Sequence, residues 1–315
     1  MQWFAQAPSN IALIKYMGKE DAQSNIPSNP SLSYTLPKLL SNVALESTHW
    51  KEDFWEPLEV PGGENFTLSA KDQLRFLSHL NYLKGFFNYQ GCFVVRSSNN
   101  FPLSSGLASS ASSFAALTKA AVAALSELTK VEPPSLEVQS ELSRVGSGSS
   151  CRSFYAPWAL WEGENVKAIK LPYMNLIHQV VIISRAEKKI SSREAHQRVK
   201  TSPLFKGRPE RAIENLKLLL QAFDAKAWID AYHICWQEFM DMHQLFTTST
   251  PSFSYMTEQT EALLKAIETH WENHGDGPLV TMDAGPNVHL LYREDQQVMA
   301  SQFTQDYLVG NHDFI

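Results

Sequence analysis

Cysteines are scarce in this 315-residue chain, and the three that occur lie far apart, at Cys92, Cys151 and Cys235. No CxxC pair occurs, so neither a disulfide framework nor a zinc ribbon is indicated. No apolar run approaches the roughly 18 residues that a bilayer-spanning helix needs. The first residues also lack the charged and apolar regions of a signal peptide. These absences predict a cytoplasmic protein with no membrane segment.

Long basic runs are missing as well, and the formal net charge is −6. This balance argues against a nucleic-acid-binding protein, but it leaves small anionic substrates open, because a cationic pocket can exist inside an acidic protein. The GxxxxGK[ST] and GxGxxG motifs are absent, which excludes a Walker loop and a Rossmann fingerprint. The hydrophobic content of 43% is ordinary for a globular chain, and the length fits one large domain or two.

Strand and helix patterns alternate along the chain and predict an α+β fold. Residues 3–5 and 11–16 have the pattern of two short strands around a turn. The segment 69–72 resembles a capping box and is expected to open a helix. Five apolar residues at helical spacing are expected to form the buried face of that helix: Leu74, Phe76, Leu77, Leu80 and Leu83.

The character of the sequence changes near residue 185. The run 180–184 predicts a buried strand, whereas residues 187–235 are mostly charged and have a helical pattern. This change predicts two domains, a nucleotide-binding domain over residues 1–184 and a C-terminal α+β domain over residues 185–315.

A stretch rich in Ser and small residues separates a predicted strand at 92–95 from a predicted helix that begins near Ala111. Strand, loop and helix start together form an anion site, because the unpaired amides of the first helical turn point at the ligand. A Ser-rich loop that only caps the helix is the alternative. The order Pro-x-x-x-Gly-Leu-x-Ser-Ser favours a phosphate loop. The candidate nucleotide-binding residues are Pro102, Ser104, Ser105, Gly106, Leu107, Ala108, Ser109 and Ser110.

Two further polar segments carry residue types suited to binding or catalysis. The loop 146–150 is rich in Gly and Ser and precedes Arg152, which can bind a carboxylate or phosphate through two parallel bonds. Asp283 begins a turn between predicted strands at 279–282 and 288–292, where a carboxylate can serve as a base or orienter. The alternatives are a Gly/Ser turn with a surface arginine, and an aspartate that only caps its turn.

Lysines near the N-terminus are candidates for neutralising phosphates. Lys15 and Lys19 flank Tyr16 within a few residues, although isolated lysines are mostly solvated. The hydroxyls of Ser109 and Ser110 are the candidate protein ligands of a phosphate oxygen or Mg²⁺.

Together these motifs resemble the galactokinase–homoserine kinase–mevalonate kinase–phosphomevalonate kinase superfamily, and within it the diphosphomevalonate decarboxylases. The matching segments occur in family order along the chain, at 7–21, 100–111, 146–153, 188–193 and 282–287. The GSGSxCRS and DAGPN segments are specific to the decarboxylases rather than to the simple kinases.

The resemblance implies a two-domain α+β small-molecule kinase fold with its active site in the cleft between the domains. The N-terminal domain would be like ribosomal protein S5 domain 2, and the C-terminal domain would be ferredoxin-like. The implied activity converts (R)-5-diphosphomevalonate and ATP, with Mg²⁺, to isopentenyl diphosphate, ADP, phosphate and CO₂, by way of phosphorylation of the 3-hydroxyl. A homodimer is also implied.

The resemblance also assigns roles to residues. Asp283 matches the catalytic aspartate, Arg152 matches the arginine that holds the substrate carboxylate, and Lys15 would lie near the transferring phosphate. The substrate, chiefly its diphosphate, would be held by Tyr16, Lys19, Ser147, Gly148, Ser149, Ser192 and Arg193.

Some departures and alternatives remain open. His196 stands where many relatives carry Met beside the diphosphate, and it is expected either to add a pH-dependent donor or to face solvent. The chain could also be a mevalonate 3-kinase or a phosphomevalonate decarboxylase of the same superfamily, or a non-catalytic nucleotide-binding regulator. Lys19, Ser192 and Arg193 favour the diphosphate substrate, and the intact catalytic aspartate argues against a regulator.

Overall fold

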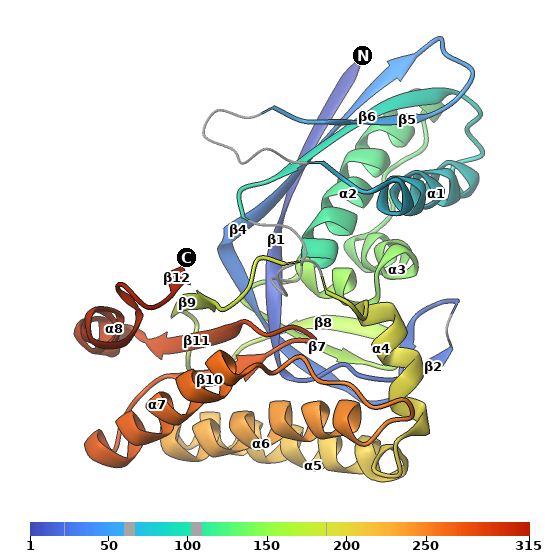
Figure 1. Cartoon of the computed structure of the whole chain (residues 1–315). Coiled ribbons are helices and arrows are strands. Elements are labelled where there is room, and N and C mark those ends of the chain that lie inside the picture. Colours follow the sequence, from blue (N-terminus) through green and yellow to red (C-terminus); the bar gives the residue numbers. More distant parts are fainter. Residues whose placement is uncertain (22, 60–66, 102–108, 187) are drawn as a thin grey trace.

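The computed structural model describes residues 1–21, 23–59, 67–101, 109–186 and 188–315. Two larger sheets and their helices form the molecule, which confirms the predicted α+β class (Figure 1). The predicted phosphate-loop residues Pro102, Ser104, Ser105, Gly106, Leu107 and Ala108 lie outside the described residues. Among the described helices, none combines the length and the apolar character that crossing a membrane requires.

The first sheet is built around one long strand. Its strands are β1 (Gln2–Ile14), β4 (Ser31–Thr48), β5 (Phe54–Pro57), β6 (Cys92–Asn99), β7 (Trp158–Glu162) and β8 (Asn165–Ile169). The order is β5-β6-β4-β7-β8, and β1 pairs with β4 in antiparallel fashion. Because β4 pairs with β1 along most of its length, the predicted pair of short strands is wrong. The register shifts between Pro8 and Ser9, where proline lacks the N–H that the ladder would use.

Three helices pack against this sheet: α1 (Ala70–Phe86), α2 (Ser109–Thr129) and α3 (Leu136–Gly146). The start of α1 confirms the predicted cap, because the Ser69 side chain accepts a hydrogen bond from the main chain of Asp72. Phe76, Leu80 and Leu83 are buried, but Leu74 is 68% exposed, so the predicted face is wrong at that position. The buried residues follow the i, i+4, i+7 spacing, and Leu74 lies off that stripe.

The second sheet has the order β10-β11-β9-β12. Its strands are β9 (Leu176–Ile182), β10 (Leu279–Met282), β11 (Val288–Arg293) and β12 (Asp313–Phe314). The strands predicted at 279–282 and 288–292 are confirmed. Because β9 pairs with β11, the second sheet begins before residue 185, and the exact domain boundary stays a prediction.

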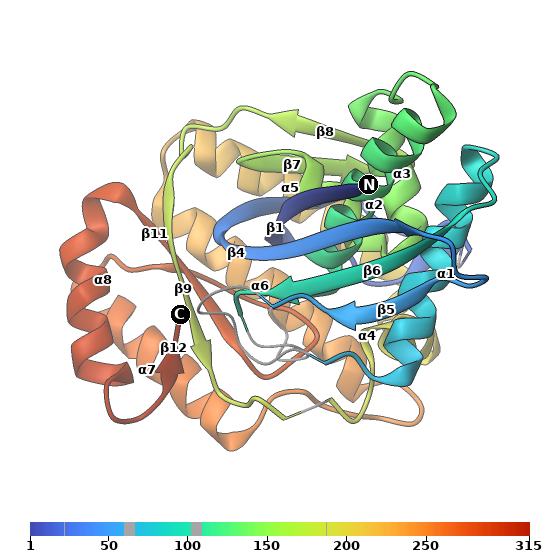
Figure 2. The ribbon, with the colours of Figure 1, turned by 90° about the horizontal axis from the view of Figure 1, so that it is seen from above.

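The remaining elements cover the second sheet or connect the two sheets. The helices are α4 (Ser192–Arg198), α5 (Arg208–Asp224), α6 (Trp228–Thr247), α7 (Glu258–His274) and α8 (Gln297–Phe303). A small hairpin joins β2 (Lys19–Asp21) to β3 (Ile26–Pro27), and the short helical segment η1 spans Gly148–Phe154. Figure 2 shows α1 and α3 on one side of the molecule and α7 and α8 on the opposite side.

Two hydrophobic clusters account for most of the core. One fills the space between the first sheet and α1, α2 and α3. The larger cluster joins Ile11 of β1 and Trp158 of β7 to Val180 of β9, Leu219 of α5 and Leu290 of β11. The two sheets therefore share buried side chains, and this shared core sets the position of one sheet against the other.

Candidate active site

A cavity of about 920 Å³ lies where the two halves of the fold meet. It brings together every predicted site residue that the structure describes: Lys15, Tyr16, Lys19, Ser109, Ser110, Ser147, Gly148, Ser149, Arg152, Ser192, Arg193 and Asp283. These residues come from the ends of β1 and β10, the starts of β2, α2 and α4, and the segment around η1. Their roles stay predictions, but their convergence in one cavity is a property of the structure.

Lys15 and Asp283 form an ion pair deep in the cavity. Lys15 directly follows β1, Asp283 directly follows β10, and the Nζ and Oδ1 atoms are 2.8 Å apart. The two strands are also joined by the Thr281 hydroxyl, which donates to the carbonyl oxygen of Ala12 at 2.9 Å. The Lys15 side chain is only 1% exposed, so the pair is shielded from water on the lysine side.

The environment of this pair keeps the aspartate charged. Burial by itself would raise the pKa of Asp283, but Lys15, His289 and Arg152 together hold that pKa below its usual range. Burial lowers the pKa of Lys15, and the contact with Asp283 opposes this effect. At neutral pH Asp283 is therefore a carboxylate able to accept a proton or a hydrogen bond.

Arg152 is buried but lacks a carboxylate within ion-pair distance among the described residues. Its Nε atom donates to Asn10 Oδ1 at 3.1 Å, and its Nη1 atom donates to the Ser31 hydroxyl at 3.0 Å. The guanidinium also lies 6.0 Å from the ring centre of Trp161. Neutral partners orient the guanidinium and leave its charge available for an anion, such as a substrate carboxylate.

The segment around η1 packs closely against Tyr16. A Cβ atom on Gly148 would lie 2.6 Å from the Tyr16 hydroxyl, so only glycine fits there without a shift. The Ser147 hydroxyl donates to Ser110 Oγ at 3.4 Å, which connects this segment to the start of α2. The Tyr16 ring itself lies between Trp161 and His196, with ring centres 4.6 Å and 4.4 Å away.

Three cations gather at one end of the cavity: Lys19, Arg75 and Arg193. Burial and the neighbouring cations, Arg193 first, lower the pKa of Lys19 to about 8. Its ammonium donates to Asn25 Oδ1, which is a neutral acceptor. Positive charges that repel one another in a partly buried site are typical of a subsite for a multiply charged anion.

Arg75 was missed by the sequence analysis. It donates from Nη2 to the carbonyl oxygen of Gly146 at 2.8 Å and lies 4.6 Å from the ring centre of Phe114. The only local signal was a basic residue directly before Phe76 on the buried face of α1. Asn10, which orients Arg152, lies in the matching segment 7–21, but a single asparagine in a strand does not by itself predict a role.

His196 behaves differently from both expectations. It is buried, and its Nδ1 atom accepts a hydrogen bond from the main chain of Gly18 at 3.0 Å. Burial, together with Lys19, Arg152 and Lys200, lowers the pKa of His196 to about 3. The imidazole is therefore neutral near pH 7 and neither faces solvent nor changes its charge near neutrality. It holds the main chain between Tyr16 and Lys19 in place.

The start of α2 is the part of the cavity suited to nucleotide phosphates. Ser109 and Ser110 are the first residues of α2 and both line the cavity, and the unpaired amides of a first helical turn are donors for an anion. No cluster of three or more His, Cys, Asp or Glu side chains suited to a metal occurs in the described parts of the chain. A divalent cation here would be held by these hydroxyl oxygens and by phosphates, the donor set that Mg²⁺ prefers.

Lys188 is a further residue outside the predicted set. It lines the cavity, and the pKa of its ammonium is lowered by burial and raised in part by the charge of Asp283. The segment 188–193 resembles the family, and within it the sequence predicts only Ser192 and Arg193 as site residues.

The protein is a two-domain enzyme with the small-molecule kinase superfamily fold. The features that define this class are the core shared by the two sheets and the cleft between the two halves, which contains the buried lysine–aspartate pair. Two family models match most of the chain and support this class. Residues 7–168 match the diphosphomevalonate decarboxylase-like N-terminal domain, and residues 178–314 match the mevalonate 5-diphosphate decarboxylase C-terminal domain. The chain belongs to the diphosphomevalonate decarboxylase family.

Relatives of known sequence and structure agree with this assignment. Diphosphomevalonate decarboxylase of Gibberella zeae is 32% identical, over 95% of this chain and 83% of the relative. A mevalonate diphosphate decarboxylase structure from Legionella pneumophila is 62% identical with a TM-score of 0.95, and each chain is covered in full. A structure of MDDEF in complex with MVAPP, AMPPCP and magnesium is 27% identical with a TM-score of 0.88, over 100% of this chain and 96% of that one.

Proposed function

We propose that the chain catalyses the ATP- and Mg²⁺-dependent decarboxylation of (R)-5-diphosphomevalonate to isopentenyl diphosphate, with release of ADP, phosphate and CO₂. The observation that carries this proposal is the single cavity that joins the Lys15–Asp283 pair, the unpaired charge of Arg152 and the cation cluster. The family membership and the bound MVAPP and AMPPCP of the MDDEF structure support it.

In the first stage Asp283 acts on the tertiary 3-hydroxyl. Its carboxylate accepts the hydroxyl hydrogen bond and takes the proton as the oxygen bonds to the γ-phosphorus of ATP, and the bond from that phosphorus to ADP breaks. Lys15 keeps Asp283 ionised and lies near the transferred phosphate. The proton moves to Oδ of Asp283, so charge and atoms balance.

In the second stage the bond between the tertiary carbon and its phosphorylated oxygen breaks, and phosphate leaves with the electron pair of that bond. Arg152 holds the substrate carboxylate, the bond between that carboxylate and its neighbouring carbon breaks, and the electron pair forms the new C=C bond while CO₂ departs. Positive charge that develops at the tertiary carbon lies beside the carboxyl group of Asp283. Removal of water by the buried walls of the cavity strengthens these interactions.

Substrate and nucleotide occupy different ends of the cavity in this proposal. The diphosphate lies among Lys19, Arg75 and Arg193, and neutral donors complete its site: Tyr16, Ser147, Gly148, Ser149 and Ser192. The nucleotide phosphates lie at the start of α2, where Ser109 and Ser110 would help to hold Mg²⁺. Bound Mg²⁺ would neutralise charge on the phosphates during transfer.

The finer organisation is proposed along with the activity. We place the domain boundary near residue 185, the protein in the cytoplasm and the active unit as a homodimer, in keeping with the family. Light scattering of the purified chain tests the dimer.

Product analysis tests the activity against its alternatives. Release of ADP and CO₂ is measured in parallel with mevalonate, its 5-phosphate and its 5-diphosphate, and we expect both products chiefly from the diphosphate. ADP without CO₂ would instead identify a 3-kinase, and preference for the monophosphate would identify a phosphomevalonate decarboxylase. Nucleotide binding without any ADP release would identify a regulator.

Substitutions at the two central residues test their roles. We expect Asp283→Ala and Arg152→Ala each to lower kcat by roughly 100-fold or more, since each removes a charge that acts in the transition state. Ser109→Ala and Ser110→Ala serve as comparisons, because they are expected to shift the ATP or Mg²⁺ dependence instead. Full activity in Asp283→Ala would remove this residue from the mechanism.

A further inference from the structure

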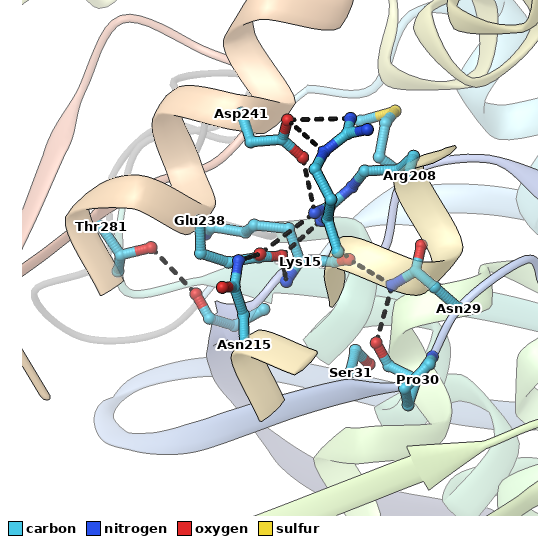
Figure 3. A network of polar contacts seen from close by, with 12 residues as sticks. Lys15, Asn29, Pro30, Ser31, Arg208, Asn215, Glu238, Asp241 and Thr281 are labelled. Carbon is cyan, nitrogen blue, oxygen red and sulfur yellow. Dashed lines mark hydrogen bonds and ion pairs between the residues drawn. The ribbon is translucent and has the colours of Figure 1, made fainter. Parts of the chain in front are cut away.

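A buried ion pair lies against the main chain of Lys15. Glu238 of α6 and Arg208 of α5 are both 0% exposed, and two hydrogen bonds join their carboxylate and guanidinium groups. Asn215 donates to the second carboxylate oxygen of Glu238 at 2.7 Å, and Asp241 accepts from Arg208 Nη1 at 2.9 Å. Figure 3 shows these side chains converging on Lys15 from the two helices.

Both polar groups of the Lys15 main chain bind to this ion pair. The Lys15 N–H donates to Glu238 Oε1 at 2.9 Å, and its carbonyl oxygen accepts from Arg208 Nη2 at 3.2 Å. The same carbonyl accepts from Asn29 Nδ2 at 2.8 Å. Because β1 ends at Ile14, Lys15 has no strand ladder to hold its main chain. The ion pair takes the place of that ladder.

A gain in folding stability does not by itself explain why an ion pair is buried at this position. Two charges removed from water lose about as much solvation free energy as their attraction returns, and apolar residues at such sites are often equally stable. A main chain whose N–H and carbonyl groups are hydrogen-bonded to opposite charges, however, has little freedom to move. The neighbouring contact from Thr281 to Ala12 fixes the preceding residues to the strand that leads to Asp283.

We propose that Glu238 and Arg208 are positioning residues, which fix the main chain of Lys15 so that its ammonium group reaches Asp283. This inference rests on the proposed function, in which the Lys15–Asp283 pair acts on the substrate. Neither Glu238 nor Arg208 lines the cavity, so each acts through Lys15 and not by contact with a ligand.

The position of Lys15 also affects the pKa of Asp283. The charged and titratable groups around it are Lys15 after β1, Arg152 of η1, Lys188 and His289 of β11, with the His243 ring of α6 bonded to its carbonyl oxygen at 3.2 Å. Lys15 is the group in direct contact, and it has the largest part in keeping the pKa of Asp283 low. Movement of Lys15 away from Asp283 therefore raises that pKa.

The test removes both buried charges at once. In the variant Glu238→Leu/Arg208→Met the Lys15 N–H loses its acceptor, while Asp241 keeps its contact with Arg211 at 2.9 Å. We expect kcat to fall by about tenfold to 100-fold, as for a misplaced catalytic group, with KM for the diphosphate substrate nearly unchanged. The acid limb of the pH profile of kcat moves to higher pH, and the melting temperature stays within a few degrees of the parent.

A matched control is available among residues that do not line the cavity. Asp53 and Lys84 also form a buried pair, at 2.7 Å, and Asp53 accepts the main-chain N–H of Phe93 at 2.7 Å. The variant Asp53→Leu/Lys84→Met removes the same chemistry and is expected to keep the melting temperature within the same few degrees of the parent, without lowering kcat or moving its pH profile.

Each outcome of these measurements either supports or overturns the proposal. A folded Glu238→Leu/Arg208→Met protein with parental kcat and pH profile would overturn the proposal. If that variant does not fold, Glu238→Gln is measured with Asp53→Asn as its control, and an unmoved acid limb with unchanged kcat would overturn the proposal equally. Absence of decarboxylase activity in the parent chain would refute the proposed function instead, so the two failures are distinguishable.

Discussion

Single side chains in the cavity differ in how their charges are balanced. Lys15 has Asp283 at 2.8 Å, whereas Lys19 faces the like charges of Arg75 and Arg193 and has the neutral Asn25 as its acceptor. The charge of Asp283 therefore opposes the lowering of the Lys15 pKa by burial, whereas the neighbouring cations add to the lowering of the Lys19 pKa.

Binding of the diphosphate substrate is expected to weaken as pH rises above about 8, the pKa of Lys19 in the free protein. Above that pKa the unbound ammonium loses its proton, and binding must first restore it, so KM rises by up to about tenfold per pH unit. Measurement of KM between pH 7 and 9.5 tests this. Lys19→Arg should lack the rise, because a guanidinium stays protonated. The same rise in Lys19→Arg would contradict the assignment.

At the scale of elements, η1 is in close contact with the segment that follows β1. The Tyr16 ring has Trp161 on one side and His196 on another, and Gly148 approaches its hydroxyl. His196 in turn accepts the N–H of Gly18. A small change in one element therefore displaces Tyr16 and its neighbour Lys19.

Gly148→Ala tests this fit. The added Cβ would lie 2.6 Å from the Tyr16 hydroxyl and 2.8 Å from its Cε1 atom, and the ring already contacts Trp161 and His196. We expect a loss of about 1–3 kcal/mol in the free energy of unfolding, as for an overpacked core, and a higher KM for the substrate.

Gly85→Ala is the control for that variant. A Cβ at Gly85, inside α1, meets nothing within 4 Å, so the helix should gain up to about 1 kcal/mol without an effect on KM. Unfolding curves in urea and steady-state kinetics measure both variants. Parental stability and KM in Gly148→Ala would show that Tyr16 is freer than the structure indicates.

At the scale of the whole molecule, the two sheets depend on one shared core. Ile11 and Trp158 of the first sheet are buried in the same cluster as Leu219 of α5 and Leu290 of the second sheet. The same arrangement carries Lys15 to Asp283, since β1 ends between α6 and β10. The geometry of the site is thus a property of the core and not of either half alone.

Loss of packing in this core should therefore affect both sheets together. Leu219→Ala, at a fully buried position, is expected to lower the free energy of unfolding by about 2–5 kcal/mol in one cooperative transition. Leu218→Ala is the matched control, because the neighbouring leucine is 39% exposed and its truncation should cost under about 1 kcal/mol. Circular dichroism and calorimetry follow the unfolding, and two separate transitions with only one displaced would contradict a shared core.

The elements with strong local signals were predictable from the sequence. The start of α1 follows from the Ser69 cap, and β10 and β11 follow from short apolar runs around a Gly-Pro turn. The continuous β1 was not predictable, because its pairing with β4 across Pro8 is a long-range contact. The burial of His196 was missed for the same kind of reason, since its partner Gly18 lies far away along the chain.

Residue types and their order along the chain by themselves determined the α+β class, the family and the chemical groups available at the site, including Asp283 and Arg152. These features are encoded in neighbouring residues, through periodicity, caps and motifs. Tertiary structure alone decided that Arg75 joins the cation cluster, that His196 is neutral, and that Glu238 and Arg208 hold Lys15. Burial and the distance between charges set these properties, and both arise only when distant segments pack together.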